Sequence, residues 1–316
     1  MPRSIASFIW RFTGRHQVGL VLLAVAVFLL STVPLELQRR LVNVLTAKGS
    51  FSTVLHLALA YGGVALTEQL LKLALNVYRG WVAESTVRSL RDVIRESEID
   101  DPSAAEAGVE IAMMLEEAEP IGGFTALSIS EPVLQGGILV SVLSYIFFLH
   151  PYLALLGLAF FVPQTIFVPL LQGAINRRAR ERILVKREIG GAIADGGNRA
   201  DRQGAITRIF ALNMGIYCLK YLMNLLMNLM HHLSVAVALC VGGWLALQGR
   251  IEVGTVVAVV GGLGKLNDPW GDLVNWGREL SVVSVKYRLF AEAAGYLADK
   301  SFPSDLKAPS PAPFAA

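Results

Sequence analysis

The stretch IYCLKYLMNLLMNLMHHLSVAVALCVGGWLAL (residues 216–247), followed by QGRIE (248–252) and VGTVVAVVGGLGKLNDPWGDLV (253–274), decides the fold of this 316-residue chain. Its two long parts are mostly apolar, and each has at least the roughly 20 residues that a helix needs to cross a bilayer. The link between them is short and polar, which leaves room only for a tight turn. The stretch therefore predicts two neighbouring membrane-spanning helices.

Four more segments of this kind precede it, at residues 18–37, 53–78, 125–149 and 152–171. The composition agrees, because 54% of the residues are hydrophobic and only 17% are charged, whereas about 25% are charged in an ordinary soluble domain. We therefore predict an all-α membrane protein with six transmembrane helices.

The connections between these segments differ in length. Residues 79–120 and 176–214 are charged and too long for simple loops, so we expect the spans to continue out of the membrane as two helical hairpins. Their turns are predicted at Asp100-Asp101-Pro102 and at the glycine pairs of residues 190–197. The opposite connections are minimal, at His150-Pro151 and at residues 248–252. The helices should therefore extend past the bilayer on one side only.

The orientation follows from the basic residues, which favour the cytoplasmic side of a membrane. Nine of them lie between the fourth and fifth spans and three in the N-terminal segment, against Arg39, Arg40 and Lys48 in the first outer loop. We expect a multi-pass protein of the cell membrane, the inner membrane in a bacterium, with both termini in the cytoplasm.

The sequence further divides into an amphipathic elbow helix at residues 1–16, lying in the membrane interface, a six-span region at residues 17–298 and a disordered, proline-rich tail at residues 299–316.

Several short motifs resemble one family. Val241-Gly242-Gly243-Trp244 is followed by Gly249-Arg250-Ile251-Glu252-Val253-Gly254-Thr255, then by Asn267-Asp268-Pro269-Trp270 and Lys286-Tyr287-Arg288-Leu289-Phe290. Leu90-Arg91 follows the second span. The order and spacing of these motifs are similar to those of the exporter-type ABC transporter membrane domain, over about residues 4 to 297.

The resemblance implies a dimer, either a homodimer or a heterodimer, that encloses a substrate cavity and is driven by ATP. The segment Gly261-Gly262-Leu263-Gly264-Lys265-Leu266 is not a phosphate-binding loop, because Val259 and Leu266 replace the required Gly and Ser or Thr. We therefore expect no catalytic residue, no metal site and no cofactor on this chain, with ATP and Mg²⁺ bound by a separate nucleotide-binding ATPase subunit.

The resemblance also implies that the tips of the two hairpins couple the chain to that ATPase, near residues 99–107 and 195–208. The candidate residues are Ile99, Asp100, Asp101, Asp195, Asn198, Arg202 and Arg208. The alternative is that these charged loops are only solvated.

Polar residues inside spans usually face the protein interior or water. The candidates for a cavity wall are Glu68, Lys72, Asn224, Asn228, Lys265, Asp268, Trp270, Asp272 and Trp276. Two simpler interpretations stay open, a Lys265 ion pair with Asp268 or Asp272 that only tethers helices and a Lys72 that reaches to the interface. The partners we expect are membrane lipid and an unidentified small-molecule, lipid or peptide substrate, which could be cationic or amphipathic, and no nucleic acid.

Two other functions remain open. The chain could be a proton-driven secondary transporter on the same fold, with Asp268 or Asp272 as the titrating group. It could also be a non-transporting membrane scaffold or regulator that binds a partner complex through its hairpins.

Overall fold

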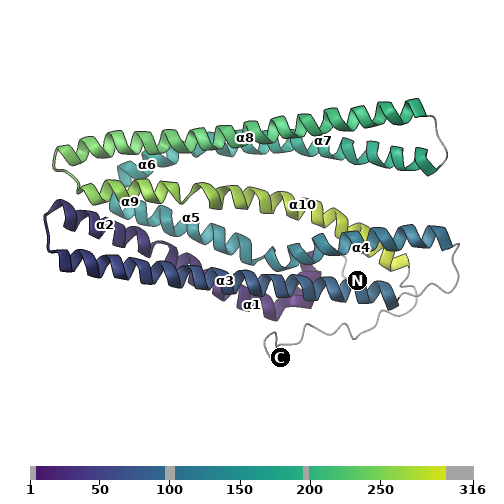
Figure 1. Ribbon diagram of the computed structural model, residues 1–316, viewed down its shortest axis with the longest axis horizontal. Coiled ribbons are helices and arrows are strands. Elements are labelled where there is room, and N and C mark those ends of the chain that lie inside the picture. The colour runs from purple at the N-terminus through teal and green to yellow at the C-terminus, as the bar shows by residue number, and fades with distance from the viewer. Residues whose placement is uncertain (1–4, 97–103, 195–198, 297–316) are drawn as a thin grey trace. The chain divides into compact units, whose positions relative to one another are not determined.

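The computed structural model describes residues 5–96, 104–194 and 199–296, which are helical with short links and contain no strand (Figure 1). The helices are α1 (Ile5–Ser31), α2 (Val33–Thr46), α3 (Phe51–Glu96), α4 (Ala104–Leu127), α5 (Ser130–Leu149), α6 (Pro151–Ala159), α7 (Val162–Ala194), α8 (Arg199–Leu247), α9 (Val253–Gly264) and α10 (Asn267–Tyr296). The predicted all-α class is confirmed for the described residues.

Five helical runs in these residues are long and apolar enough to cross a membrane. They are Ile5–Thr46, Phe51–Asp92, Ser130–Leu149, Pro151–Val185 and Gln203–Leu247. The sixth predicted span is instead divided between α9 and the start of α10. Pro269 explains the division, because proline lacks the N–H that would bond the carbonyl of Lys265, and its ring clashes with that carbonyl.

Two helices are much longer than a bilayer is thick. With a rise of 1.5 Å per residue, the 46 residues of α3 and the 49 of α8 span about 69 Å and 74 Å, against a hydrocarbon core of about 30 Å. Helix α3 lies beside α4, and helix α7 lies beside α8 (Figure 1). The predicted helical hairpins are therefore present, although the candidate residues Ile99, Asp100, Asp101, Asp195 and Asn198 lie outside the described residues.

Both predicted tight turns are confirmed. His150 separates α5 from α6, and its Nδ1 accepts a hydrogen bond from the Leu153 backbone N–H at 3.3 Å. Pro151 occupies the first position of α6, where a missing N–H costs nothing. Between α8 and α9 the chain turns at Gly249, whose φ of 69° suits glycine better than any residue with a side chain.

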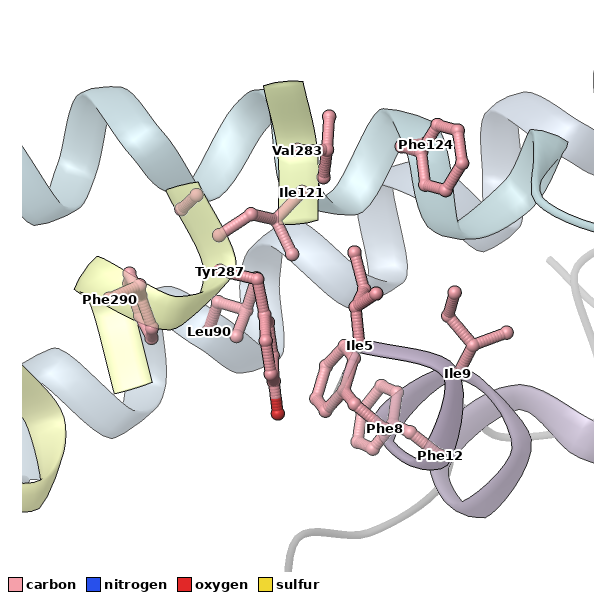
Figure 2. Close-up of a cluster of buried hydrophobic side chains, with 11 residues drawn as sticks. Ile5, Phe8, Ile9, Phe12, Leu90, Ile121, Phe124, Val283, Tyr287 and Phe290 are labelled. Atoms are coloured by element: carbon pink, nitrogen blue, oxygen red, sulfur yellow. The ribbon is translucent and has the colours of Figure 1, made fainter. Parts of the chain in front are cut away.

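The chain divides into two compact units. Unit 1 comprises Met1–Tyr145 and Asp268–Ala316, and unit 2 comprises Ile146–Asn267. A buried cluster in unit 1 joins the start of α1 to α3, α4 and α10 (Figure 2). Its members are Ile5, Phe8, Ile9, Phe12, Leu90, Ala118, Ile121, Phe124, Val283, Tyr287 and Phe290. Burial within the cluster raises the pKa of Tyr287 to about 12.

In the structure the predicted elbow segment is the first part of a longer helix. Residues 5–16 are not a separate helix, because α1 runs without a break from Ile5 to Ser31. The apolar face of these residues packs against the protein, with Phe8 only 5% exposed. Phe8 stacks on Phe12 at 5.5 Å between ring centroids and lies 5.3 Å from the Tyr287 ring. Aromatic packing partners from α10 explain why this face turned inward.

Unit 2 is held together by close contacts at small residues. A Cβ atom on Gly157 would lie 2.5 Å from a methyl of Leu263, which places α6 directly against α9. Ser234 of α8 donates a hydrogen bond to the Gly157 carbonyl at 3.2 Å. Met223 and Met227 are also buried, so these methionines pack within the unit.

Candidate functional site

The predicted cavity residues fall on both units. Unit 1 holds Glu68 and Lys72 on α3, and Asp268, Trp270, Asp272 and Trp276 on α10, whereas unit 2 holds Asn224 and Asn228 on α8 and Lys265 after α9. Two groups of polar side chains emerge, one in each unit.

A network of polar side chains in unit 1 joins α3, α5 and α10. Arg79 of α3 forms an ion pair with Glu131 at 2.6 Å and donates a hydrogen bond to the Ser130 hydroxyl at 2.9 Å. The Gln135 side-chain amide donates to Glu131 at 2.8 Å and to Asp272 of α10 at 2.9 Å. Gln135 therefore connects a carboxylate of its own helix with one of α10.

Sequence reasoning found Asp272 but missed Arg79, Glu131 and Gln135. Arg79 falls at the boundary between a span and a charged connection, where a basic residue is ordinary, and its partner lies 52 residues later. One signal was available, because Glu131 and Gln135 are four residues apart and so share a helix face. No pattern in the sequence shows which basic residue meets them.

Burial makes this network costly to disturb. Arg79 is 8% exposed, and a buried charge is tolerated only with a paired, hydrogen-bonded partner. One guanidinium and two carboxylates leave the network with a formal surplus of one negative charge. Glu131 is paired with Arg79, whereas Asp272 is exposed. The surplus negative charge of the network is therefore on Asp272, where other groups can contact it.

The network lies near the end of a span. Helix α5 has 20 residues from Ser130 to Leu149, which is about the length that crosses a bilayer, and Glu131 is its second residue. Immediately before it, the link between α4 and α5 is fixed by Trp276, whose Nε1 donates to the Ser128 carbonyl at 3.2 Å. The network therefore joins three helices where the membrane region passes into the α3–α4 hairpin.

The remaining cavity candidates of unit 1 have different surroundings. Glu68 is 6% exposed and pairs with Lys72 at 2.7 Å on the same helix, so their charges cancel. Trp276 lies against Phe124 inside the unit. Asp268 is exposed and has no ion-pair partner among the described residues. The buried Nε1 of Trp270 also has no hydrogen-bond acceptor within the described part of the chain.

The second group is a polar stripe on α8. Tyr217, Lys220, Tyr221, Asn224 and Asn228 each lie three or four residues from another member of the stripe and are all exposed. Met223 and Met227 occupy the buried side of the same helix. The two tyrosine rings stack at 6.3 Å. Polar side chains in a span are costly against lipid, so this stripe suits water or another protein surface. Lys265 is half-buried and belongs to no part of the stripe.

The α7–α8 hairpin is fastened by polar contacts beyond the predicted spans. Arg208 pairs with Glu181 at 2.7 Å, and Arg182 donates to the Asn213 side chain at 3.1 Å. The coupling candidate Arg208 therefore contacts the other helix of its own hairpin. Arg202 lies on α8, but its side chain is outside the described residues.

The long apolar helices and the hairpins beyond them define a multi-pass membrane protein. Residues 17–193 match the family model of the ABC transporter transmembrane region, which is more than half of the chain. The chain therefore belongs to the ABC transporter transmembrane family. No curated protein matches its sequence.

Proposed function

We propose that this chain is the membrane-spanning permease subunit of an ABC transporter, and that ATP hydrolysis in a separate nucleotide-binding subunit powers it. The observation that carries the proposal is the length of α3 and α8, because helices that extend about 40 Å beyond the bilayer give such a subunit a surface to push against. The family match supports the same conclusion.

In this proposal α9 and the first part of α10 form the sixth span, interrupted at residues 265–266. The protein lies in the inner or plasma membrane, and both its termini and both hairpins are in the cytoplasm. The basic residues of α7 support that orientation, since Arg177 and Arg180 are exposed just beyond the fourth span. Two copies, or one copy and a related chain, would enclose the substrate path.

The mechanism follows from what the helices can transmit. The ATPase binds ATP and Mg²⁺ and moves the tips of the hairpins, while this chain is not itself an enzyme. Helices α3 and α4 carry that motion to the network of Arg79, Glu131, Gln135 and Asp272. The Gln135 amide links α5 to the Asp272 carboxylate of α10, so a shift of the hairpin changes the contact between the two helices. Cavity access changes as a result.

Each unit leaves polar side chains available for contact with a substrate. Asn224 and Asn228 are exposed on α8 of unit 2, and Asp268 is exposed on α10 of unit 1. The Glu68–Lys72 pair adds no net charge to unit 1.

The test is purification of the tagged full chain from its native membrane, with mass spectrometry of the proteins that accompany it and an ATPase assay. We expect an ATPase subunit that co-purifies with the chain and loses activity when residues 195–208 are replaced by a Gly-Ser segment. Replacement of the exposed outer residues 47–50 serves as the matched control and should leave the activity unchanged. A pure chain without any ATPase would contradict the proposal.

A second candidate function is favoured by one observation. Asp272 shares the Gln135 amide with Glu131, and two neighbouring carboxylates are a common proton-binding arrangement. A proton-driven transporter would lose flux in an Asp272→Asn variant. The ATP-driven permease should retain most of it, because the side-chain carbonyl oxygen introduced by this substitution can still accept a hydrogen bond from Gln135. Flux measured in proteoliposomes under a pH gradient, with and without ATP and the ATPase, distinguishes the two.

A further inference from the structure

One face of α1 is exposed along the whole helix. Val18, Leu22 and Leu29 are 54%, 65% and 59% exposed, and Arg11 and Arg15 are exposed on the N-terminal continuation of the same face. The phase of the helix shows that this is one stripe. Arg11 and Leu29 are 18 residues apart, which is about five turns of an α-helix, and Arg15, Val18 and Leu22 follow at intervals of three or four.

The apolar part of the stripe suits hydrocarbon. It belongs to a helical run whose composition and length fit a membrane span, and its large side chains are not covered by the chain. Arg15 precedes Val18 by three residues, or about 4.5 Å along the axis. The two arginines therefore lie at the level where the hydrocarbon ends and the lipid headgroups begin.

The N-terminal end of α1 carries positive charge only. Helix α1 contains no acidic residue, and neither Arg11 nor Arg15 has an ion-pair partner among the residues that the structure describes. Trp10 beside them is 65% exposed, and tryptophan is enriched at membrane interfaces. An arginine guanidinium binds phosphate oxygens through two parallel hydrogen bonds.

We propose that Arg11 and Arg15 form a binding site for the phosphate group of an anionic phospholipid, at the interface level that the exposed Trp10 also marks. The acyl chains of that lipid run along Val18, Leu22 and Leu29. The lipid contact is thus made by a face that lies about 100° around the helix from the apolar one that packs into the buried cluster of Figure 2. The assignment to the cytoplasmic leaflet rests on the proposed orientation, whereas binding of the lipid does not depend on it or on transport.

The test uses the full chain in detergent micelles, titrated with dioleoylphosphatidylglycerol or dioleoylphosphatidylcholine, with bound lipid counted by native mass spectrometry. We expect phosphatidylglycerol to bind the unchanged chain more tightly than phosphatidylcholine. The R11Q/R15Q variant should weaken phosphatidylglycerol binding about 30-fold, since each basic residue near an anionic surface contributes about a factor of five. R11K/R15K should retain only part of the affinity, because lysine keeps the charge but cannot form the two parallel hydrogen bonds.

A matched control removes two other positive charges. Lys48 and Arg88 are exposed and lie off α1, so K48Q/R88Q should bind phosphatidylglycerol as the unchanged chain does. If the R11Q/R15Q variant does not fold, R11Q and R15Q singly should each weaken binding about fivefold.

Three outcomes would overturn the proposal. The first is unchanged phosphatidylglycerol binding by R11Q/R15Q. The second is competition by millimolar inorganic phosphate, which would make the ligand a free anion. The third is efficient crosslinking of two L22C chains in the membrane, which would show that a second copy covers this face. None of these outcomes bears on whether an ATPase co-purifies, so the two proposals fail separately.

Discussion

The buried charge of Arg79 depends on its ion pair with Glu131. Its side chain is 10% exposed and that of Glu131 is 15% exposed, so Glu131→Gln leaves a guanidinium in a poorly solvated place without its counter-charge. Removal of one partner from such a pair costs about 3–5 kcal/mol. We therefore expect Glu131→Gln to lower the free energy of unfolding in detergent by about that amount, measured by chemical or thermal denaturation.

Glu119 provides the control for this prediction. It pairs with Arg91 at 2.7 Å in the same unit, but its side chain is 69% exposed. Exposed ion pairs contribute at most about 1 kcal/mol, so Glu119→Gln should have little effect. The double variant R79Q/E131Q should recover much of the lost stability, because neither member of the buried Arg79–Glu131 pair is then left charged without its partner. Equal losses for Glu131→Gln and Glu119→Gln would contradict this account of the pair.

At the scale of single residues, the sequence predicted positions better than partners. Asp272 was expected to be part of a polar face, and it does belong to a polar network. The partner that the structure gives Asp272 is the side-chain amide of Gln135 on α5, which was not among the candidates. Helical spacing along one segment cannot reveal which other segment lies against it. For this reason Gln135 and Arg79 were not predicted as members of the site.

Among the elements, the interruption between α9 and α10 has a local cause. Lys265 and Leu266 donate to carbonyls three residues earlier, at 3.0 and 3.2 Å, and the helix restarts at Asn267. Pro269→Ala restores an N–H that can bond the Lys265 carbonyl. We expect slower hydrogen exchange in peptides covering residues 264–272, measured by mass spectrometry.

Pro169→Ala is the matched control for that experiment. Pro169 lies inside α7, which continues past it without a break, so its replacement should leave exchange at residues 264–272 unchanged. Exchange that stays as fast in Pro269→Ala as in the unchanged chain would show that another feature interrupts the helix.

The start of α1 yields a second prediction about elements. Phe8 is 5% exposed and contacts both Phe12 and Tyr287. Truncation of a buried phenylalanine to alanine costs about 3–5 kcal/mol, so Phe8→Ala should loosen the N-terminal turns from α10. Trypsin should then cleave after Arg11 and Arg15 markedly faster, as followed by mass spectrometry. Trp10→Ala, at an exposed position, should leave that rate unchanged, and equal rates in both variants would contradict the role of the cluster.

The sequence predicted most of the elements because each rests on a local pattern. Five of the six apolar segments correspond to helical runs that can cross a membrane, and the turns at His150-Pro151 and residues 248–252 were predicted because so few residues separate the apolar segments. The elbow helix shows a limit of such patterns. Amphipathicity shows that residues 5–12 have an apolar face, but a bilayer interface and a protein core satisfy such a face equally well.

For the whole molecule, the basic residues predict which side faces the cytoplasm. Tags placed at either end should be digested by protease in inside-out membrane vesicles and protected in right-side-out vesicles, because the basic hairpins and the N-terminal arginines stay on the cytoplasmic side. The turn at residues 248–252, tagged in the same way, should give the reverse pattern. Digestion of the two ends from opposite sides would mean an odd number of crossings.

The unbroken course of α3 restricts how the length of the chain can vary. Arg79 and Leu90 lie on one helix, and each has to meet its own partners, the first on α5 and the second in the buried cluster. One inserted residue between them would turn everything beyond it by about 100° and advance it by about 1.5 Å, and Leu90 would leave the cluster. Insertions and deletions can therefore accumulate at the turns at residues 47–50 and 248–252, while within α3 even a single added residue disrupts the fold.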